Sequence, residues 1–207
     1  MAHPKVTRRQ IIKGAAAVGA IGAFGLPLDA FADEGGSAGD RRLRWDLIDI
    51  TPPDIRAGGE DTASSEGETM LNLTGSGTFR RGHSRDVTGG GTWNSNNPVV
   101  GGSGTYRVTE FISWVRAPGT LAGTPLVDHI GKLTDTRAGL AVLRIAYSDG
   151  LGGVLFLSCN LNGTPPSVDE GINASRGFVN FFMPAMIGFG NHSNRTLFHA
   201  LHEGEEG

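Results

Sequence analysis

Short segments in which apolar and polar residues alternate dominate this chain. In the first of them, Leu43, Trp45 and Leu47 alternate with Arg44 and Asp46. Because successive side chains of a β-strand point to opposite faces, this pattern predicts a strand with one buried face. No amphipathic pattern longer than two helical turns occurs. Further strands are expected at residues 106–114, 139–147, 154–161, 177–182 and 195–202.

Glycine marks the turns between several of these strands. The chain holds 33 glycines, and three segments share the pattern Gly-x-Gly-Thr-aromatic, beginning at Gly75, Gly89 and Gly102. Glycine adopts the left-handed conformations that tight turns need, whereas threonine and aromatic residues favour strands. A phosphate-binding glycine loop would require a following helix, which no periodicity predicts here. The repeat therefore predicts successive turns, each leading into a strand.

These patterns predict an all-β fold. An antiparallel β-barrel of about eight to ten short strands is favoured, and a β-sandwich is the alternative. A single domain is expected over residues 42–207, preceded by a flexible lead-in at residues 33–41. Residues 51–68 are rich in glycine, serine and acidic residues, so we expect them to form a long loop.

Residues 1–32 differ in composition from the rest of the chain. Arg8 and Arg9 precede a lysine and a weakly hydrophobic run of glycine and alanine, which ends in the small residues Ala30 and Ala32. This arrangement resembles the signal peptides that bacterial proteins present to the twin-arginine export machinery. The resemblance implies cleavage by signal peptidase after Ala32, a secreted or periplasmic location, and no stable membrane anchor afterwards. A transmembrane anchor is the alternative, but the run is short and contains Pro27.

Charge and cysteine content narrow the classes of function. The whole chain has a formal net charge of −3, and the expected signal carries four basic residues and one acidic residue, so the remainder has a charge of −6. An acidic chain whose only dense basic run is residues 41–44 is not expected to bind nucleic acid. The only cysteine, Cys159, excludes an internal disulfide. Its place on an apolar strand face predicts a buried structural thiol.

Two glycine-rich segments, residues 86–93 and 98–107, resemble barrel strands of dirigent proteins and allene oxide cyclases. The second segment contains Val-Val-Gly-Gly-Ser-Gly-Thr-Tyr, which matches the pattern V-x-G-G-[ST]-G-x-[FY] of those families. The resemblance covers about 35 residues and implies an eight-stranded type of barrel with a central apolar cavity. The pocket acids and arginines of these families cannot be placed in this chain, so the resemblance implies no activity.

Polar residues on otherwise apolar strand faces are the candidates for a ligand-binding site. By alternation Glu110 lies on an inward face, and His199 lies between two leucines of the last strand. A buried charge is costly unless it is paired, so we expect Glu110 to lie buried beside Arg144 or His199. Two other interpretations stay open, namely a face assigned the wrong way round and a structural ion pair. The residues expected to be buried with Glu110 are Tyr106, Val108, Ile112 and Trp114, and the candidate ligand-binding residues are Tyr106, Glu110, Trp114, Arg144 and His199.

Recognised catalytic and metal-binding motifs are absent from the sequence. It contains no H-E-x-x-H metal motif, no calcium-binding loop and no G-x-S-x-G nucleophile turn. No metal and no cofactor are therefore expected. Acids and histidines without a recognised spacing occur in the expected loops at His83, Asp86, Asp128, His129, Asp149, Asp169 and Glu170.

Three functions remain open. The first is an exported, non-catalytic barrel that binds a small apolar or amphipathic ligand. The second is a cofactor-independent isomerase or cyclase, in which Glu110 and His199 converge inside the barrel cavity. The third is an extracellular interaction protein that assembles through sheet edges or exposed aromatic residues. The first is favoured because the strand pattern predicts a barrel and no catalytic motif occurs.

Overall fold

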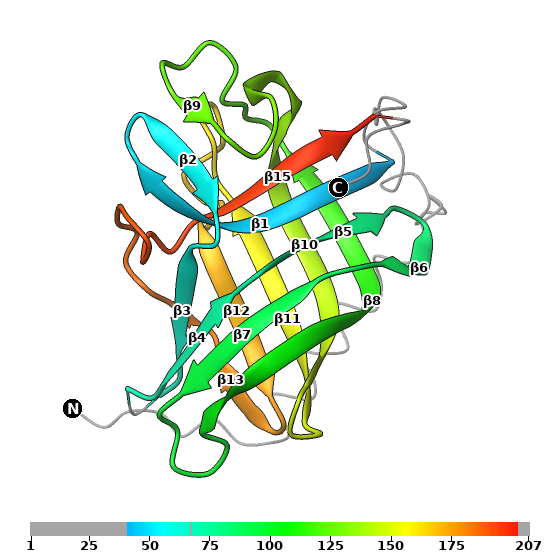
Figure 1. Cartoon of the computed structure of the whole chain (residues 1–207), viewed down its shortest axis with the longest axis vertical. Coiled ribbons are helices and arrows are strands. Elements are labelled where there is room, and N and C mark those ends of the chain that lie inside the picture. Colours follow the sequence, from blue (N-terminus) through cyan, green and yellow to red (C-terminus); the bar gives the residue numbers. More distant parts are fainter. Residues whose placement is uncertain (1–40, 67, 203–207) are drawn as a thin grey trace, which may run out of the picture. The chain divides into compact units, whose positions relative to one another are not determined.

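The computed structural model describes residues 41–66 and 68–202, where the regular structure is almost entirely β-strand (Figure 1). A short 3-10 turn at Leu133–Asp135 is the one exception in this part of the chain, and no helix there could span a membrane. The expected signal peptide and residues 33–40 of the expected lead-in lie outside the described residues. The strands are β1 (Arg42–Thr51), β2 (Asp54–Ala57), β3 (Glu60–Ser64), β4 (Met70–Thr74), β5 (Ser76–Arg80), β6 (His83–Val87), β7 (Gly90–Ser95), β8 (Gly102–Ala117), β9 (Val127–Asp128), β10 (Thr136–Tyr147), β11 (Gly152–Cys159), β12 (Gly171–Arg176), β13 (Val179–Phe181), β14 (Met183–Pro184) and β15 (Thr196–Leu201).

Six of these strands close into an antiparallel ring. Neighbours pair in the order β8, β10, β15, β1, β5 and β7, and β7 pairs with β8 again. The shortest link in the ring joins β5 to β7 through one pair of residues, Ser76 and Gly90. The predicted antiparallel β-barrel is therefore confirmed, and the sandwich is not observed.

Two groups of strands extend the sheet beyond this ring. β11, β12 and β13 continue from β10, whereas β4, β3 and β14 continue from β7. In Figure 1, β1 and β15 run across the direction of β10, β11 and β12. The short strand β2 pairs with the last residues of β1, and β9 lies parallel beside β2. The face of β1 and β15 that points away from the barrel interior is thus bordered by β2 and by the segment that carries β9.

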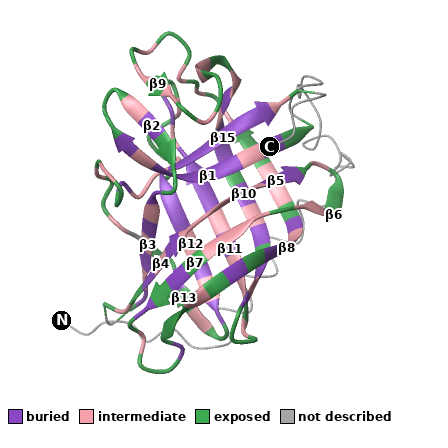
Figure 2. Ribbon diagram, in the orientation of Figure 1, coloured by how far each residue is buried: buried purple, intermediate pink, exposed green. Residues whose placement is uncertain are grey.

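The inner face of β1 carries some of the largest core side chains. Leu43, Trp45 and Leu47 are fully buried, as their alternation predicts, and Figure 2 shows burial along the barrel strands. Within the same core, Phe79 stacks on Phe111 with ring centroids 4.8 Å apart. Burial of one such side chain contributes roughly 1.5–3 kcal/mol to the free energy of folding. The barrel interior is therefore a packed apolar core.

Cys159 belongs to this core. It is fully buried at the end of β11, on the same face as Leu155 and Leu157. Burial raises the pKa of its thiol well above the usual value. The prediction of a buried structural thiol agrees with this placement, since a protonated and inaccessible thiol is a poor nucleophile.

The glycine repeats precede or begin β5, β7 and β8, as predicted. At Gly89 the backbone φ is +115°, and a Cβ atom would lie 2.3 Å from the carbonyl oxygen of Ser76. Only glycine fits such a position, because a side chain would collide with the neighbouring backbone. Each glycine segment therefore forms the tight turn or strand start that leads into β5, β7 or β8.

The prediction of a loop over residues 51–68 is wrong, because this segment contains β2 and β3. In β3, Asp61 and Ala63 are buried and alternate with half-buried polar residues. The alternation of apolar and polar residues does not predict β3, because the buried Asp61 takes the place of an apolar residue. For a similar reason the pattern does not predict β12, where the buried Arg176 takes the place of an apolar residue. In the segment expected at 177–182, the structure has the three-residue strand β13.

Two irregularities in β8 change which of its residues face the core. Val108 and Glu110 lie opposite consecutive residues of β10, and so do Phe111 and Ser113. Each irregularity therefore adds one residue to β8, which reverses the alternation beyond it. The predicted burial of Ile112 is wrong for this reason, since its side chain is 45% exposed while Phe111 is buried.

Candidate functional site

Glu110 and Arg144 form an ion pair on the outer side of the barrel wall. Nε of Arg144 donates to Oε2 of Glu110 over 2.9 Å, and the two side chains are 57% and 41% exposed. The prediction that Glu110 faces the core is wrong, because the extra residues in β8 turn it outward. Arg144 is the predicted partner, but an exposed pair of this kind defines no ligand cavity.

Tyr106 and Trp114 belong to the packing of the barrel interior. Tyr106 is buried, and its hydroxyl donates to the carbonyl oxygen of Thr74 over 3.0 Å. Burial raises the pKa of this phenol far above its usual range. The ring of the half-buried Trp114 contacts Phe198 with centroids 4.6 Å apart. Both residues therefore have clear structural partners.

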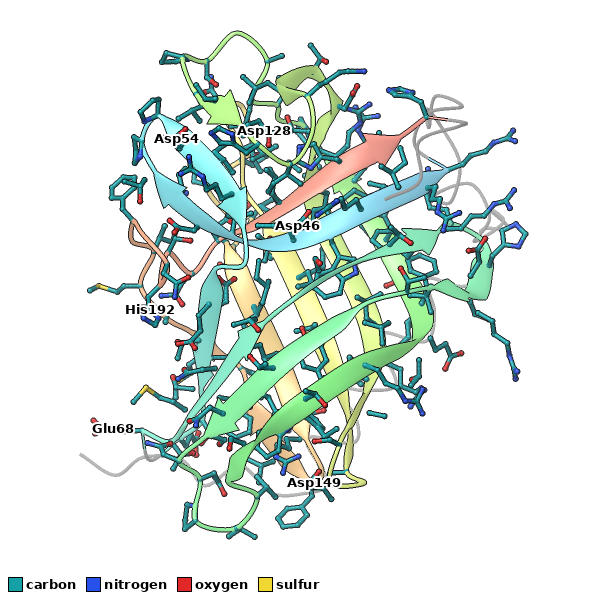
Figure 3. All side chains as sticks on the ribbon, viewed as in Figure 1. Asp46, Asp54, Glu68, Asp128, Asp149 and His192 are labelled. Carbon is teal, nitrogen blue, oxygen red and sulfur yellow. The ribbon has the colours of Figure 1, made fainter. Side chains whose placement is uncertain are left out.

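His199 is buried, and its partner is Asp128 rather than Glu110. Nε2 of His199 lies 2.7 Å from Oδ2 of Asp128, and both side chains are almost fully buried. Oδ1 of Asp128 accepts the backbone N–H groups of Ile130 and Gly131. Figure 3 shows Asp128 on the segment above β15. Although burial acts to raise it, these hydrogen bonds hold the pKa of Asp128 below its usual value.

The five predicted residues do not form one site. Arg144 lies opposite Glu110, and Thr136 lies opposite His199, and both partners belong to β10. Eight residues of a strand span about 26 Å, so Glu110 and His199 lie at distant positions along the barrel wall.

The outer face of β1 and β15 holds a second ionic pair next to His199. Arg44 lies opposite His199, and Asp46 lies opposite Leu197. Arg44 donates to both carboxylate oxygens of Asp46, over 2.8 and 2.9 Å. Burial raises the pKa of Asp46, and the bonds from Arg44 oppose this shift. One end of this outer face is therefore covered by paired charges.

A pocket lies farther along the same outer face. Its volume is about 270 Å³, and most of its lining is apolar. The floor comes from β1 and β15, and the walls come from β2 and from the chain segments around residues 121–126, 160–170 and 189–195. We call this cavity the outer pocket. Its main apolar lining residues are Ile48, Ile55, Leu126, Leu161, Phe189 and Leu197.

Glu170 is a polar residue in the wall of the outer pocket. Its two carboxyl oxygens accept the backbone N–H groups of Asn160, over 2.5 Å, and Thr196, over 2.8 Å. Burial raises the pKa of Glu170 to about 8, against the opposing effect of these two bonds. This carboxyl therefore joins the segment before β12 to the start of β15 and is largely protonated at neutral pH.

Asp61 lies close behind this wall. Its side chain is fully buried, and Oδ1 accepts the backbone N–H of Arg195 over 2.9 Å. Oδ2 is buried and has no hydrogen-bond partner. Burial raises the pKa of Asp61 to about 7, and the bond from Arg195 opposes the shift. Two buried carboxyls thus accept the N–H groups of two consecutive residues, Arg195 and Thr196.

Arg195 supplies the positive charge of the pocket wall. Its side chain is half-buried, and Nε donates to the carbonyl oxygen of Gly188 over 3.3 Å. The guanidinium lies 5.7 Å from the centroid of the Phe189 ring, which also lines the pocket. Among the described residues, its two terminal nitrogens have no hydrogen-bond partner and form no ion pair. A charged group with free donors therefore borders an apolar cavity.

Another buried arginine lies near the turn between β10 and β11, at the other end of the barrel, where Figure 3 labels Asp149. Arg176 is almost fully buried, and its Nε donates to the carbonyl oxygen of Val100 over 2.7 Å. Its two terminal nitrogens bind the two carboxylate oxygens of Asp149. The guanidinium also lies over the ring of Trp93 at 3.6 Å and near that of Tyr147 at 4.7 Å. Every nitrogen of Arg176 is thus used within the protein.

The sequence patterns do not predict the outer pocket. The sequence marks Glu170 only as a loop acid without a recognised spacing, and it marks neither Arg195 nor Asp61 behind the pocket wall. No local signal connects Asp61 to Arg195, because 134 positions separate them in the chain. In residues 41–66 and 68–202, no group of three or more histidine, cysteine or acidic side chains could hold a metal ion.

Comparisons with known proteins give no relative from which to read this site. The chain matches no protein-family model, no curated protein and no solved structure.

Proposed function

We propose that this chain is an exported β-barrel protein that binds a small amphipathic molecule in the outer pocket. The observation that carries the proposal is the pocket itself, an apolar cavity of about 270 Å³ bordered by Glu170 and Arg195. Small-molecule sites typically combine an apolar lining with a few polar groups that orient the ligand. The outer pocket has this composition.

The volume of the pocket limits the size of the ligand. An apolar cavity of about 150 Å³ is enough to hold benzene. A cavity of about 270 Å³ therefore suits a molecule with one ring and a short substituent, or an aliphatic chain of similar bulk. The packed barrel interior suggests that the ligand binds outside it, which differs from the central cavity implied by the dirigent and cyclase resemblance.

Filling the pocket tests the proposal. Leu126 lines the cavity, so we expect Leu126→Trp to abolish binding of benzyl alcohol, measured by ligand-observed NMR. Val99, which is 69% exposed and outside the pocket lining, offers a matched control. Val99→Trp should bind benzyl alcohol as the unmodified protein does. Binding that is absent from the unmodified protein, or equal in both variants, would contradict the proposal.

The isomerase or cyclase alternative receives no support from the residues on which it depended. It required Glu110 and His199 to converge inside one cavity, but they lie on β8 and β15, opposite residues of β10 that are far apart along that strand. The outer pocket does contain a buried carboxyl, Glu170, but both of its oxygens already accept backbone N–H groups. These bonds favour a positioning role over proton transfer.

Self-association of two copies is a second candidate function, favoured by one observation. Within residues 178–189, six large apolar side chains are at least 46% exposed. Among the residues that the structure describes, the strand β13 in this stretch pairs only with β12, and its other edge has no partner strand there. Light scattering tests this candidate: a dimer that Phe178→Ser with Met186→Ser converts to a monomer supports it, and a monomer at all concentrations rules it out. The exposed side chains are Phe178, Phe182, Met183, Met186, Ile187 and Phe189.

The proposal of export rests on residues 1–32. Replacing Arg8 and Arg9 by lysine keeps the charge but alters the arginine pair that the resemblance depends on. We expect the double variant to stay inside cells that carry the twin-arginine machinery, as shown by cell fractionation. Unchanged export would contradict the twin-arginine route.

A further inference from the structure

The terminal nitrogens of Arg195 are charged donors at the outer pocket without a partner among the described residues. The arginine lines the cavity, its Nε is held by Gly188, and its guanidinium plane borders the Phe189 ring. By contrast, Arg176 donates hydrogen bonds to the carboxylate of Asp149, and Arg44 donates to that of Asp46. A half-buried guanidinium with unpaired donors beside an apolar cavity is therefore unusual within this molecule.

The acidic groups near Arg195 do not take up these donors. Both oxygens of Glu170 accept backbone N–H groups, and Oδ1 of Asp61 accepts the N–H of Arg195 itself. Glu60, the neighbour of Asp61, forms an ion pair with His192 over 3.0 Å. The positive charge of Arg195 is thus left without a direct counter-ion in the described part of the chain.

Resting on the proposed function, we propose that the ligand of the outer pocket carries a carboxylate, which binds the terminal nitrogens of Arg195 while its apolar part fills the cavity. The planar guanidinium matches a carboxylate through two parallel hydrogen bonds. A ligand amine would be repelled by Arg195. A doubly charged phosphate would need several donors, whereas the other polar side chains of the lining are Glu170, Thr196, Asn160 and Asn162.

The buried carboxyls support this assignment at neutral and lower pH. Because burial raises the pKa of Asp61 to about 7 and that of Glu170 to about 8, both are mainly protonated at about pH 6. They then add no negative charge that would repel an anionic ligand. The experiment is therefore set at pH 6.

A pair of ligands of similar shape separates charge recognition from cavity filling. Benzoate and benzamide are used as probes, and their dissociation constants are measured by titration calorimetry on the full chain. A charge-assisted bidentate contact predicts that benzoate binds about tenfold more tightly or better. In Arg195→Met this preference should disappear while benzamide still binds, which also shows that the variant is folded. Arg195→Lys, which keeps the charge without the planar fork, should keep part of the preference.

The outcomes distinguish this inference from the proposed function. Equal binding of both probes to the unmodified protein, or a benzoate preference that survives in Arg195→Met, overturns the carboxylate assignment and leaves ligand binding in place. Failure of both probes to bind overturns the proposed function as well. Loss of both probes in Leu126→Trp, with the preference intact in Val99→Trp, places the effect in the outer pocket.

Discussion

Each end of the barrel has an arginine near an aromatic ring and a carboxyl group, with Arg176 fully buried and Arg195 half-buried, and the two ends pair the charge differently. Near the β10–β11 turn, Arg176 uses all of its nitrogens on Val100 and Asp149 and packs against Trp93. At the outer pocket, Arg195 keeps two nitrogens free. Close to them, Oδ2 of Asp61 has no partner either.

This difference bears on whether a charged side chain stabilises the fold or is available to bind a ligand. A buried polar atom without a partner costs about 1–3 kcal/mol, so a fold built for stability alone would pair it. At the end with Arg176, every nitrogen of the arginine is paired, although the indole N–H of Trp93 is buried without a partner. At the end with Arg195, a cavity lies beside a half-buried guanidinium whose terminal nitrogens have no partner among the described residues, and the unpaired Oδ2 of Asp61 is buried behind the cavity wall. Unpaired groups beside a cavity are expected at a binding site, where a ligand completes the pairing.

Breaking the paired end should produce the largest effect. We expect Arg176→Met to lower the free energy of unfolding by about 3 kcal/mol, because it removes the charge-assisted hydrogen bonds of a buried guanidinium to the partly exposed Asp149 and the contact with Trp93. Urea denaturation measures the loss. The same substitution at the exposed Arg144 is the control and should cost far less. A loss below about 1 kcal/mol at Arg176 would mean that pairing does not set the stability of this end.

The unpaired end should respond to pH in the opposite sense from a salt-bridged carboxylate. The pKa of Asp61 is raised from 3.8 to about 7, so its folded form holds a proton that the unfolded chain releases. Stability is therefore fullest below about pH 4 and falls as pH rises through 7, by about 2–3 kcal/mol between pH 5 and 8. Asp61→Asn resembles the protonated acid and should remove this part of the pH dependence.

Thermal unfolding of the two proteins from pH 5 to 8 checks this. The variant should match the unmodified protein near pH 5 and exceed its melting temperature near pH 8. Parallel curves over the whole range would show that Asp61 does not carry the raised pKa.

The strands that define the barrel could be predicted wherever one of their faces is apolar throughout. The alternation of Leu43, Trp45 and Leu47 with polar residues predicts β1. The alternating residues of β10 and β11 predict those strands in the same way. β3 and β12 were missed because buried Asp61 and Arg176 occupy positions where an apolar residue is expected. Burial of these polar residues cannot be predicted from local sequence, because their hydrogen-bond partners lie far away in the chain.

The candidate site was less predictable than the fold. His199 was recognised as a polar residue on an apolar face, and it is buried as that pattern suggests. Glu110 was assigned to the wrong face because one added residue in a strand leaves no mark in the pattern of residue types. Asp61, Glu170 and Arg195 meet only when β3, β12 and β15 come together. Their arrangement depends on closure of the sheet and not on local spacing.

A smaller effect is expected where the outer face is held by a charged pair. Asp128→Asn keeps the acceptor for Ile130 and Gly131 but replaces the carboxylate that binds His199. We expect a loss of about 1 kcal/mol at neutral pH, measured by urea denaturation. Because the pKa of Asp128 is lowered, its contribution is present above about pH 4 and is lost as pH falls further. The loss should therefore shrink in acid, and a constant loss would contradict the charged pairing.

The smallest effect should come from the barrel wall between the two ends, where Glu110 and Arg144 pair in solvent. Both side chains are largely exposed, so water already stabilises each charge and salt screens their attraction. A double-mutant cycle with Glu110→Gln and Arg144→Met should give a coupling energy of about 0.5 kcal/mol or less. The coupling should decline further in about 1 M salt, whereas most of the loss in Arg176→Met should persist, since the Arg176 guanidinium is buried and its packing on Trp93 is little screened. A coupling as large as that of the buried arginine would show that burial is not what separates these pairs.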